Sequence, residues 1–357
     1  MAKVKIACPD CGRVLQYDEL YVGNKIKCPH CKLSIFIRQA SLAGIARPRQ
    51  RRIKRNAVIF SSSSILLAIV AVLWIWLLEP VRVQWPDRRP IGILFLASDF
   101  HASAKNPRGW FNDANLDIVG PGGAARFRKA LFDYTDRSIA NLKRTGAQGV
   151  IVWDLEGEQF PHKISFIGDP RLLDRLAPEM LPVVDEFFGR LRGAGLKIGL
   201  TIRPQQFAFI KGHPRQTQVL DIKQILLSKI NYARAHWGVT IFYVDSNGGI
   251  RRPDEAAQLR SLAAQQPEIL LIPEHHYLPY WEFSAPYVSL RRGEPALTAT
   301  VARKLFPGAI QALDISGASQ ESAEITEAWT QGDILLFRAW EWSPECDILE
   351  RLSRDSQ

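Results

Sequence analysis

The sequence predicts an α/β protein whose larger part folds as a (β/α)8 barrel, preceded by a zinc ribbon and one transmembrane helix. Three observations support this prediction. Four of the five cysteines lie within the first 31 residues, a long stretch without charge follows, and short apolar runs then alternate with amphipathic stretches. The expected segments are a zinc ribbon (1–36), a basic linker (37–56), the membrane helix (57–78), a second linker (79–89) and the barrel (90–357).

The composition is that of a folded protein with an uneven distribution of charge. Of the 357 residues, 46% are hydrophobic and 23% are charged, which is enough apolar material for a large core. The net charge of +10 belongs to residues 1–56, which hold 13 Lys and Arg against 3 Asp and Glu. The remaining chain is balanced, so a nucleic-acid partner is not expected for the barrel.

The first segment carries two C-x2-C pairs, Cys8 with Cys11 and Cys28 with Cys31, separated by sixteen residues. Each pair presents two thiolates to one ion, and four thiolates complete a tetrahedral zinc site. Because no ligand position stays open, the zinc is expected to be structural. A redox-active cysteine pair is the alternative, but two pairs at this spacing favour metal binding.

The same segment resembles a small bacterial zinc-ribbon family that often begins membrane proteins. That family reads C-P-x-C-G, a short strand pair, then G-x-K-x-x-C-P-x-C, and Gly23, Lys25 and Lys27 fall in the expected hairpin. The resemblance covers about 35 residues. The ribbon is expected to bind a partner, which is as readily a protein as nucleic acid.

Residues Ala57–Leu78 form a 22-residue run without charge, apolar except for Ser61–Ser64. As a helix it would reach roughly 33 Å, enough to cross a hydrocarbon core of about 30 Å. Trp74, Trp76 and Trp85 near its far end are expected at the membrane interface. A buried core helix is the alternative, but core helices rarely run this long without a charge.

The charges that flank the run predict its orientation. Six Arg and Lys residues lie between positions 47 and 55, whereas three Arg lie between positions 82 and 89. The positive-inside rule therefore places the ribbon in the cytoplasm and the barrel on the outer, periplasmic side of the cytoplasmic membrane. The protein is expected to be a single-pass membrane protein, and its basic segment can also attract anionic lipid headgroups.

The barrel is predicted from the regular alternation of strands and helices after residue 90, which indicates parallel strands joined by crossover helices. A doubly wound sheet is the alternative, but no Gly-rich phosphate-binding sequence follows the first strand. The expected strands are Ile91–Ala97, Gly149–Asp154, Leu196–Ile202, Val239–Val244, Ile269–Ile272, Tyr287–Leu290, Ile310–Leu313 and Ile334–Phe337. The expected helices include Arg126–Thr145, Glu179–Ala194, Leu220–His236, Pro253–Ala264 and Gln320–Thr330.

Polar and aromatic residues gather where these strands end, at the face where barrels of this kind place their sites. Rings can stack on the apolar face of a pyranose while carboxylates and amides bind its hydroxyls, so a carbohydrate substrate or ligand is expected. The candidate substrate-binding residues are Asp99, Trp110, Asp154, Glu156, Arg203, Gln205, Asn247, His275, Asp314, Trp340 and Glu341.

Three strand sequences give the barrel a resemblance to the TIM-barrel glycoside hydrolases of the α-galactosidase and α-glucosidase type. They are Val150–Glu156, Ile198–Pro204 and Phe242–Asn247. The resemblance implies that Asp245, ending the fourth strand, is the nucleophile. The family takes its general acid from near the sixth strand, where this chain offers Glu294.

Two other acids are candidates for the partner of Asp245. Glu274 ends the neighbouring fifth strand and substitutes for the family's acid by position. Another hydrolase group uses strands four and seven, which would pair Asp245 with Asp314. The leading expectation is a membrane-anchored glycosidase with Asp245 as nucleophile or base, Glu274 as acid and no cofactor in the barrel.

Two alternatives stay open. One is a non-catalytic sugar-binding sensor that signals through the membrane helix to the ribbon. The other is a metal-dependent hydrolase that uses His101, His275 and His276, although adjacent residues on one strand point to opposite sides.

Overall fold

The computed structural model describes residues 3–8, 11–18, 25–32, 34–36, 83–162, 164, 166–292 and 297–355. These residues belong to two units, divided between Leu77 and Leu78, and each unit is described by itself.

The N-terminal unit consists of two antiparallel strand pairs. Strand β1 (Lys3–Ala7) pairs with β2 (Val14–Asp18), and β3 (Lys25–Lys27) pairs with β4 (Ser34–Phe36). One C-x2-C pair follows β1 and the other follows β3, so each lies in the turn of a hairpin. This arrangement is the one expected for the ribbon.

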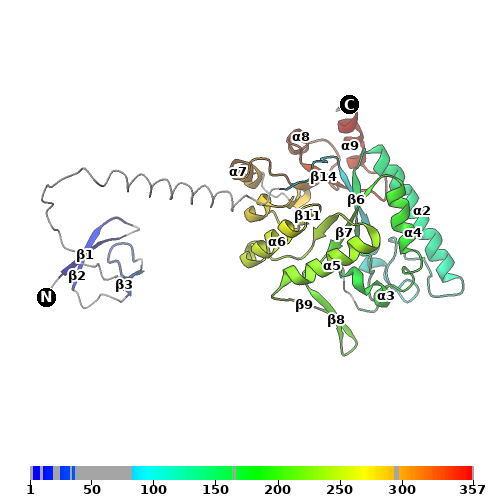
Figure 1. Ribbon diagram of the computed structural model, residues 1–357, viewed down its shortest axis with the longest axis horizontal. Helices are drawn as coiled ribbons and strands as arrows, with labels where there is room; N and C mark the ends of the chain where they lie inside the picture. The colour runs from blue at the N-terminus through cyan, green and yellow to red at the C-terminus, as the bar shows by residue number, and fades with distance from the viewer. Residues whose placement is uncertain are drawn as a thin grey trace, which may run out of the picture. The chain divides into compact units, whose positions relative to one another are not determined.

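The larger unit contains eight parallel strands in the order β11-β10-β7-β6-β5-β14-β13-β12, which curve into a barrel (Figure 1). All eight predicted strands are present, with ends that differ from the prediction by two residues or fewer. The strands are β5 (Ile91–Phe95), β6 (Gly149–Trp153), β7 (Lys197–Ile202), β10 (Ile241–Val244), β11 (Leu270–Pro273), β12 (Tyr287–Ser289), β13 (Ala312–Asp314) and β14 (Ile334–Arg338).

The barrel is nearly closed between β11 and β12, the two ends of this order. The backbone N–H of Ala285, just before β12, donates to the carbonyl of Leu271 in β11 at 3.0 Å. A doubly wound sheet would leave these two strands far apart, so this hydrogen bond supports the predicted barrel.

Helices surround the strands, and all five predicted helices are present. Helices α3 (Leu173–Leu176), α7 (Leu297–Leu305) and α9 (Pro344–Asp355) were not among the named predictions, nor was the hairpin of β8 (Gln206–Ile210) and β9 (His213–Thr217). This hairpin turns at Lys211 and Gly212, both of which adopt positive φ. The helices are α2 (Gly123–Arg144), α3 (Leu173–Leu176), α4 (Val184–Gly193), α5 (Ile222–Trp237), α6 (Pro253–Gln265), α7 (Leu297–Leu305), α8 (Ala323–Thr330) and α9 (Pro344–Asp355).

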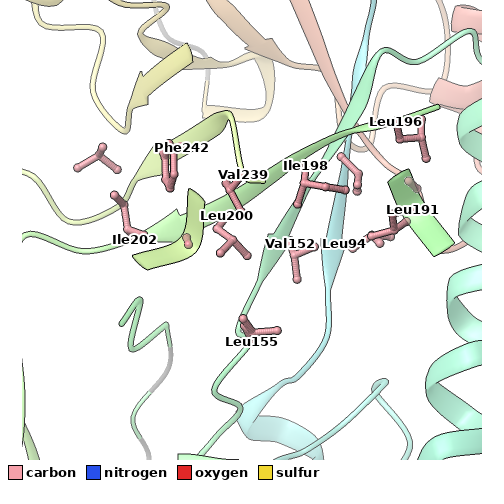
Figure 2. Close-up of a cluster of buried hydrophobic side chains, with 14 of the residues drawn as sticks. Leu94, Val152, Leu155, Leu191, Leu196, Ile198, Leu200, Ile202, Val239 and Phe242 are labelled. Carbon is pink, nitrogen blue, oxygen red and sulfur yellow. The ribbon is translucent and has the colours of Figure 1, made fainter. Parts of the chain in front are cut away.

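The alternation of side chains along each strand creates two cores. One face of each strand points toward the helices, where Val152, Ile198, Leu200 and Phe242 are buried (Figure 2). The other face points into the barrel, where the first residues of the strands pack together near the barrel's N-terminal end. These inner residues include Ile91, Ile151, Ile241, Leu270, Ala312 and Ile334.

Trp85 completes the floor of the barrel, by which we mean the end where the strands begin. Its ring is 7% exposed and packs with the inner residues, and its Nε1 donates to Gln148 Oε1 at 2.9 Å. The prediction that Trp85 lies at a membrane interface was therefore wrong. From sequence alone, a tryptophan near an apolar run is consistent both with a membrane interface and with a buried core position. The fold shows that Trp85 is in the core.

No helix within the described ranges is long and apolar enough to cross a membrane. The predicted span 57–78, with Trp74 and Trp76, lies outside the described residues.

Candidate functional site

Polar side chains gather at the mouth of the barrel, by which we mean the end where the strands finish. They lie there because side chains alternate between the inner and outer faces along each strand. Counting by twos from Ile241 and Tyr243, both in the inner core, places Asp245 on the inner side at the end of β10. The same counting from Leu270 and Ile272 places Glu274 on the inner side just after β11. The two predicted catalytic acids therefore end neighbouring strands.

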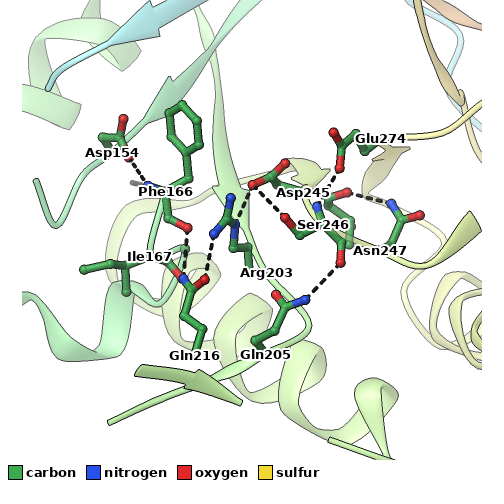
Figure 3. Close-up of polar contacts among 12 residues, drawn as sticks. Asp154, Phe166, Ile167, Arg203, Gln205, Gln216, Asp245, Ser246, Asn247 and Glu274 are labelled. Carbon is green, nitrogen blue, oxygen red and sulfur yellow. Dashed lines mark hydrogen bonds and ion pairs between the residues drawn. The ribbon is translucent and has the colours of Figure 1, made fainter. Parts of the chain in front are cut away.

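Asp245 forms an ion pair with Arg203, the residue that follows the neighbouring strand β7. Its Oδ2 lies 2.5 Å from Arg203 Nε, and the Asp245 side chain is 8% exposed (Figure 3). Arg203 is held in turn by Gln216 of β9, whose Oε1 accepts from Arg203 Nη1 at 2.7 Å. The hairpin β8–β9 thus supports the guanidinium that compensates the charge of Asp245.

Ser246 links the two acids. Its backbone N–H donates to Glu274 Oε2 at 2.8 Å, and its hydroxyl donates to Asp245 Oδ2 at 3.5 Å. Ser246 adopts a positive φ of 55°, a conformation that a residue other than glycine rarely takes. Burial and the nearby Asp245 carboxylate raise the pKa of Glu274 above its ordinary value. The two acids therefore differ in environment although they are adjacent.

A further acid, Asp154, is buried at the end of β6. Its Oδ1 accepts from the backbone N–H of Phe166 at 2.8 Å, and its backbone φ is 56°. Among the described residues, its Oδ2 has no hydrogen-bond partner. Burial, together with the charges of Glu158 and Glu156, raises the pKa of Asp154 well above its ordinary value.

Six aromatic rings line the mouth around these acids, and we call them the aromatic set. Ring centroids of Trp153 and Tyr243 are 4.6 Å apart, and those of Phe95 and Trp153 are 4.9 Å apart. Both Trp153 and Tyr243 are buried, whereas Phe95, Phe166 and Trp340 are partly exposed. The members are Phe95, Trp153, Phe166, Tyr243, Tyr287 and Trp340.

On the other side of the mouth, Asp314 of β13 is bonded to Tyr287 of β12. Tyr287 donates its hydroxyl to Asp314 Oδ2 at 2.6 Å, while Asp314 Oδ1 accepts from the backbone N–H of Ser316. Burial, and then the Asp314 charge, raises the pKa of Tyr287. No described contact joins Asp314 to Asp245, so the pairing of Asp245 with Glu274 has the better geometric support.

Two predicted substrate-binding residues lie in the interior instead. Trp110 has no exposed surface, packs against Phe111 and Phe127, and donates its Nε1 to Glu179 Oε1 at 2.8 Å. Its assignment as a ligand-stacking ring was wrong, because an aromatic residue after a strand can also fill the layer between strands and helices.

Glu156 is the second of these residues and is 2% exposed. Burial raises its pKa to about 7, and the charges of Asp169 and Lys229 act on it as well. Lys229, in α5, has no exposed side-chain surface and donates to the carbonyls of Gly168, Arg203 and Gln205 at 3.0, 2.7 and 2.9 Å. Glu156 therefore belongs to a buried charged cluster that fixes the chain beside Arg203.

The other predicted residues lie at or around the mouth in different roles. Gln205 and Asn247 are buried and bond to backbone carbonyls, Gln205 to that of Ser246 and Asn247 to that of Val244. His275 Nε2 lies 3.0 Å from the carbonyl oxygen of Asn247. Asp99 is half-buried in a short 3-10 helix, and Glu341 is exposed.

Several residues at the mouth were not predicted. Ser246 gave no sequence signal, because its role depends on its backbone conformation. Tyr243 could have been found, since it lies two residues before Asp245 and must face the same side. Glu294 lies outside the described residues.

In the N-terminal unit the four cysteines converge. Their Sγ atoms all lie within 4.8 Å of one another, with Cys8 3.6 Å from Cys31 and Cys11 3.8 Å from Cys28. The backbone N–H of Cys31, and then that of His30, lowers the pKa of Cys28 to about 7, which favours the thiolate. The cluster can hold a metal ion such as zinc.

Within the described parts of the chain, no second group of three or more His, Cys, Asp or Glu is close enough to hold an ion. The three histidines of the predicted metallohydrolase therefore form no such group. Cys346, the fifth cysteine, is buried, and burial raises the pKa of its thiol.

Comparison with known proteins gives structural similarity alone. No protein-family model and no curated protein matches the chain. An α-amylase from Lactobacillus plantarum shares 11% identity, with 76% of this chain and 80% of that one covered and a TM-score of 0.43. An α-fucosidase from Thermotoga maritima shares 13% identity, with 77% of this chain and 74% of that one covered and a TM-score of 0.41. An α-galactosidase from Lactobacillus brevis shares 11% identity over 61% of this chain, with a TM-score of 0.39. The matched part spans only 37% of the length of that α-galactosidase.

Proposed function

We propose that the barrel is a carbohydrate-active enzyme that hydrolyses glycosidic bonds at its mouth. The observation that carries the proposal is the pair Asp245 and Glu274, two adjacent acids with arginines at different distances. Arg203 Nε lies 2.5 Å from Asp245 Oδ2, whereas Arg292 Nη1 lies 4.0 Å from Glu274 Oε1. Arg203 compensates the charge of Asp245, which supports a carboxylate there. The raised pKa of Glu274 favours its protonated form. Glycoside hydrolysis requires one carboxylate and one protonated acid on either side of the bond.

In the proposed reaction, Glu274 donates its proton to the departing glycosidic oxygen as the bond to the anomeric carbon breaks. Asp245 either attacks that carbon or removes a proton from a water molecule that attacks it. Ser246 holds both acids and so fixes their relative positions. The partly exposed rings of the aromatic set, such as Phe95 and Trp340, provide apolar surface for a pyranose.

A non-catalytic sugar-binding protein is the second candidate, and one observation favours it. Both acids already have hydrogen-bond partners, Asp245 in Arg203 and Glu274 in the backbone of Ser246. A purely structural pair would look the same. Turnover distinguishes the two candidates, because a sugar-binding protein would bind its ligand at the mouth without hydrolysing it.

The deciding experiment measures hydrolysis of aryl α- and β-glycosides and oligosaccharides by the full chain in detergent. Asp245→Asn and Glu274→Gln are expected to lower turnover at least 1,000-fold, on the order of 4 kcal/mol. Asp136→Asn, an exposed acid on α2, is the matched control and is expected to keep full activity. Saturable sugar binding without turnover in the unaltered protein would favour the sensor.

We also propose that residues 57–78 anchor the protein in the cytoplasmic membrane, with a structural zinc ribbon inside and the barrel outside. The length and apolar character of this run and the excess of basic residues before it support the proposal. An alkaline phosphatase fused to the C-terminus should be active, since that enzyme requires an oxidising exterior. An inactive fusion that remains intact in the cytoplasm would refute this orientation.

A further inference from the structure

A cavity of about 760 Å³ lies beside the two acids. Its walls come from the segments that follow β9, β10 and β11. Asp245 and Glu274 do not line it, but Ser246 and His275, which follow them in the sequence, do. The lining residues are Gln218, Ser246, Asn247, Gly248, Arg251, Arg252, His275, His276, Tyr277 and Leu278.

The cavity carries the positive charge of Arg251, which no described residue balances. Two arginines and two histidines line it, and none of its lining residues is an acid. Arg252 is compensated, since its Nη1 bonds Glu255 Oε1 at 2.8 Å and Gln218 Oε1 at 2.9 Å. Arg251 is exposed and makes no ion pair with any described residue. Its guanidinium is therefore available to an anion.

The acid beneath the cavity is already fully engaged. Glu255 is 1% exposed, and its second oxygen accepts from the backbone N–H of Gly248 at 2.5 Å. This carboxylate is covered by Arg252 and so does not repel an anion at the opening. Among the charged lining residues, the group left open to a ligand is the guanidinium of Arg251.

The loop that carries Arg251 is packed tightly. Gly249 has a φ of 50°, and a Cβ there would lie 2.8 Å from His275 Cδ2. A Cβ on Gly248 would lie 2.3 Å from Arg252 Cβ. Both glycines therefore let the loop approach its neighbours closely, and this packing reduces the ordering that a ligand must impose.

The remaining walls suit a sugar ring. Tyr277 and Leu278 are half-buried and offer apolar surface, while Ser246 and Gln218 offer polar atoms for hydroxyls. Arginine binds carboxylate or sulfate through paired N–H groups. We propose that this cavity binds an anionic sugar unit, a pyranose that bears a carboxylate or a sulfate. The inference rests on the proposed function and makes the substrate an acidic glycan.

The test is calorimetric binding to the full chain in detergent, with probes that exist in anionic and neutral forms. We would use oligogalacturonates and oligoglucuronates with their methyl esters, and sulfated galactan oligosaccharides with their desulfated forms. At least one anionic probe is expected to bind ten-fold or more tightly than its neutral form. The uronate and sulfate arms distinguish the two sources of the negative charge.

Arg251→Gln is expected to reduce the affinity for that anionic probe about ten-fold, toward that of the neutral form. Arg137→Gln, an exposed arginine on α2, is the matched control and should leave binding unchanged. The comparison also excludes binding to residues 1–56, whose net charge of +10 is the same in both variants. Equal affinity for anionic and neutral forms of every probe, or unchanged binding by Arg251→Gln, would overturn the inference.

The outcomes separate this inference from the proposed hydrolysis. Asp245→Asn should abolish turnover while it leaves the preference for the anionic probe in place. Preference without any turnover would retain the cavity and reject the enzyme. Turnover of neutral glycosides without any preference for the anionic probe would retain the enzyme and reject the cavity as an anion-binding site.

Discussion

Arg203 and Asp245 form an ion pair, 2.5 Å between Nε and Oδ2, that joins the ends of β7 and β10 at the mouth of the barrel. Both side chains are mostly buried, with exposed fractions of 13% and 8%. Little solvent screens the pair, so each charge depends on the other. The pair therefore contributes to the stability of the mouth and holds the proposed catalytic acid in place.

Removal of the arginine alone should be costly. Arg203→Gln leaves the Asp245 carboxylate buried without its counter-charge, which typically costs about 3 to 5 kcal/mol. The double variant Arg203→Gln with Asp245→Asn should recover at least about 1 kcal/mol of that loss. Urea unfolding of the four proteins measures the difference, and strictly additive effects would show that the two charges do not interact.

Trp110 and Trp340 should respond differently to truncation. Trp110 has no exposed surface, so Trp110→Ala is expected to lower the free energy of unfolding by about 3 to 5 kcal/mol. Trp340 is partly exposed at the mouth, so Trp340→Ala should cost less stability and should weaken sugar binding. Denaturant unfolding and sugar titration of both variants test this, and the opposite ranking would contradict our placement of the two rings.

Glu156 should make stability depend on pH. Its pKa is about 7 in the folded protein, against about 4.5 in an unfolded chain, so the folded state holds the proton more tightly. The contribution is fully present below about pH 4.5 and is lost as the pH rises through 7. Across that window the unaltered protein should lose on the order of 3 kcal/mol relative to Glu156→Gln. Unfolding free energies of both proteins at pH 4.5, 6 and 8 measure it, and parallel profiles would refute the prediction.

The four-cysteine cluster should bind one zinc ion per chain. Cys11→Ser removes one of four converging thiolates and is expected to reduce the bound zinc substantially. Elemental analysis of the purified proteins gives the ratio. Cys346→Ser is the control, because this thiol is buried in the barrel unit, and equal zinc in both variants would count against the site.

The sequence predicted the barrel strands and the positions of Asp245 and Glu274 at strand ends, because both follow from simple periodicities. Alternation along β10 and β11 fixes the side of Asp245 and Glu274 once the strands are located. The burial of Trp110, Trp85 and Glu156 could not be predicted this way. The burial of each side chain depends on which distant part of the chain packs over it, and the residue type alone does not reveal that packing. Ser246 was missed because its role comes from its backbone.

Trp85 also has a consequence for how the barrel can be shortened and approached. A fragment that begins at Ile91 would lack the ring that closes the floor and the Nε1–H partner of Gln148. Any shorter version should therefore start upstream of Trp85. The same ring shows that the chain joins the barrel at the end opposite the mouth. Val83 and Trp85 therefore lie at the opposite end of the barrel from Asp245 and Glu274.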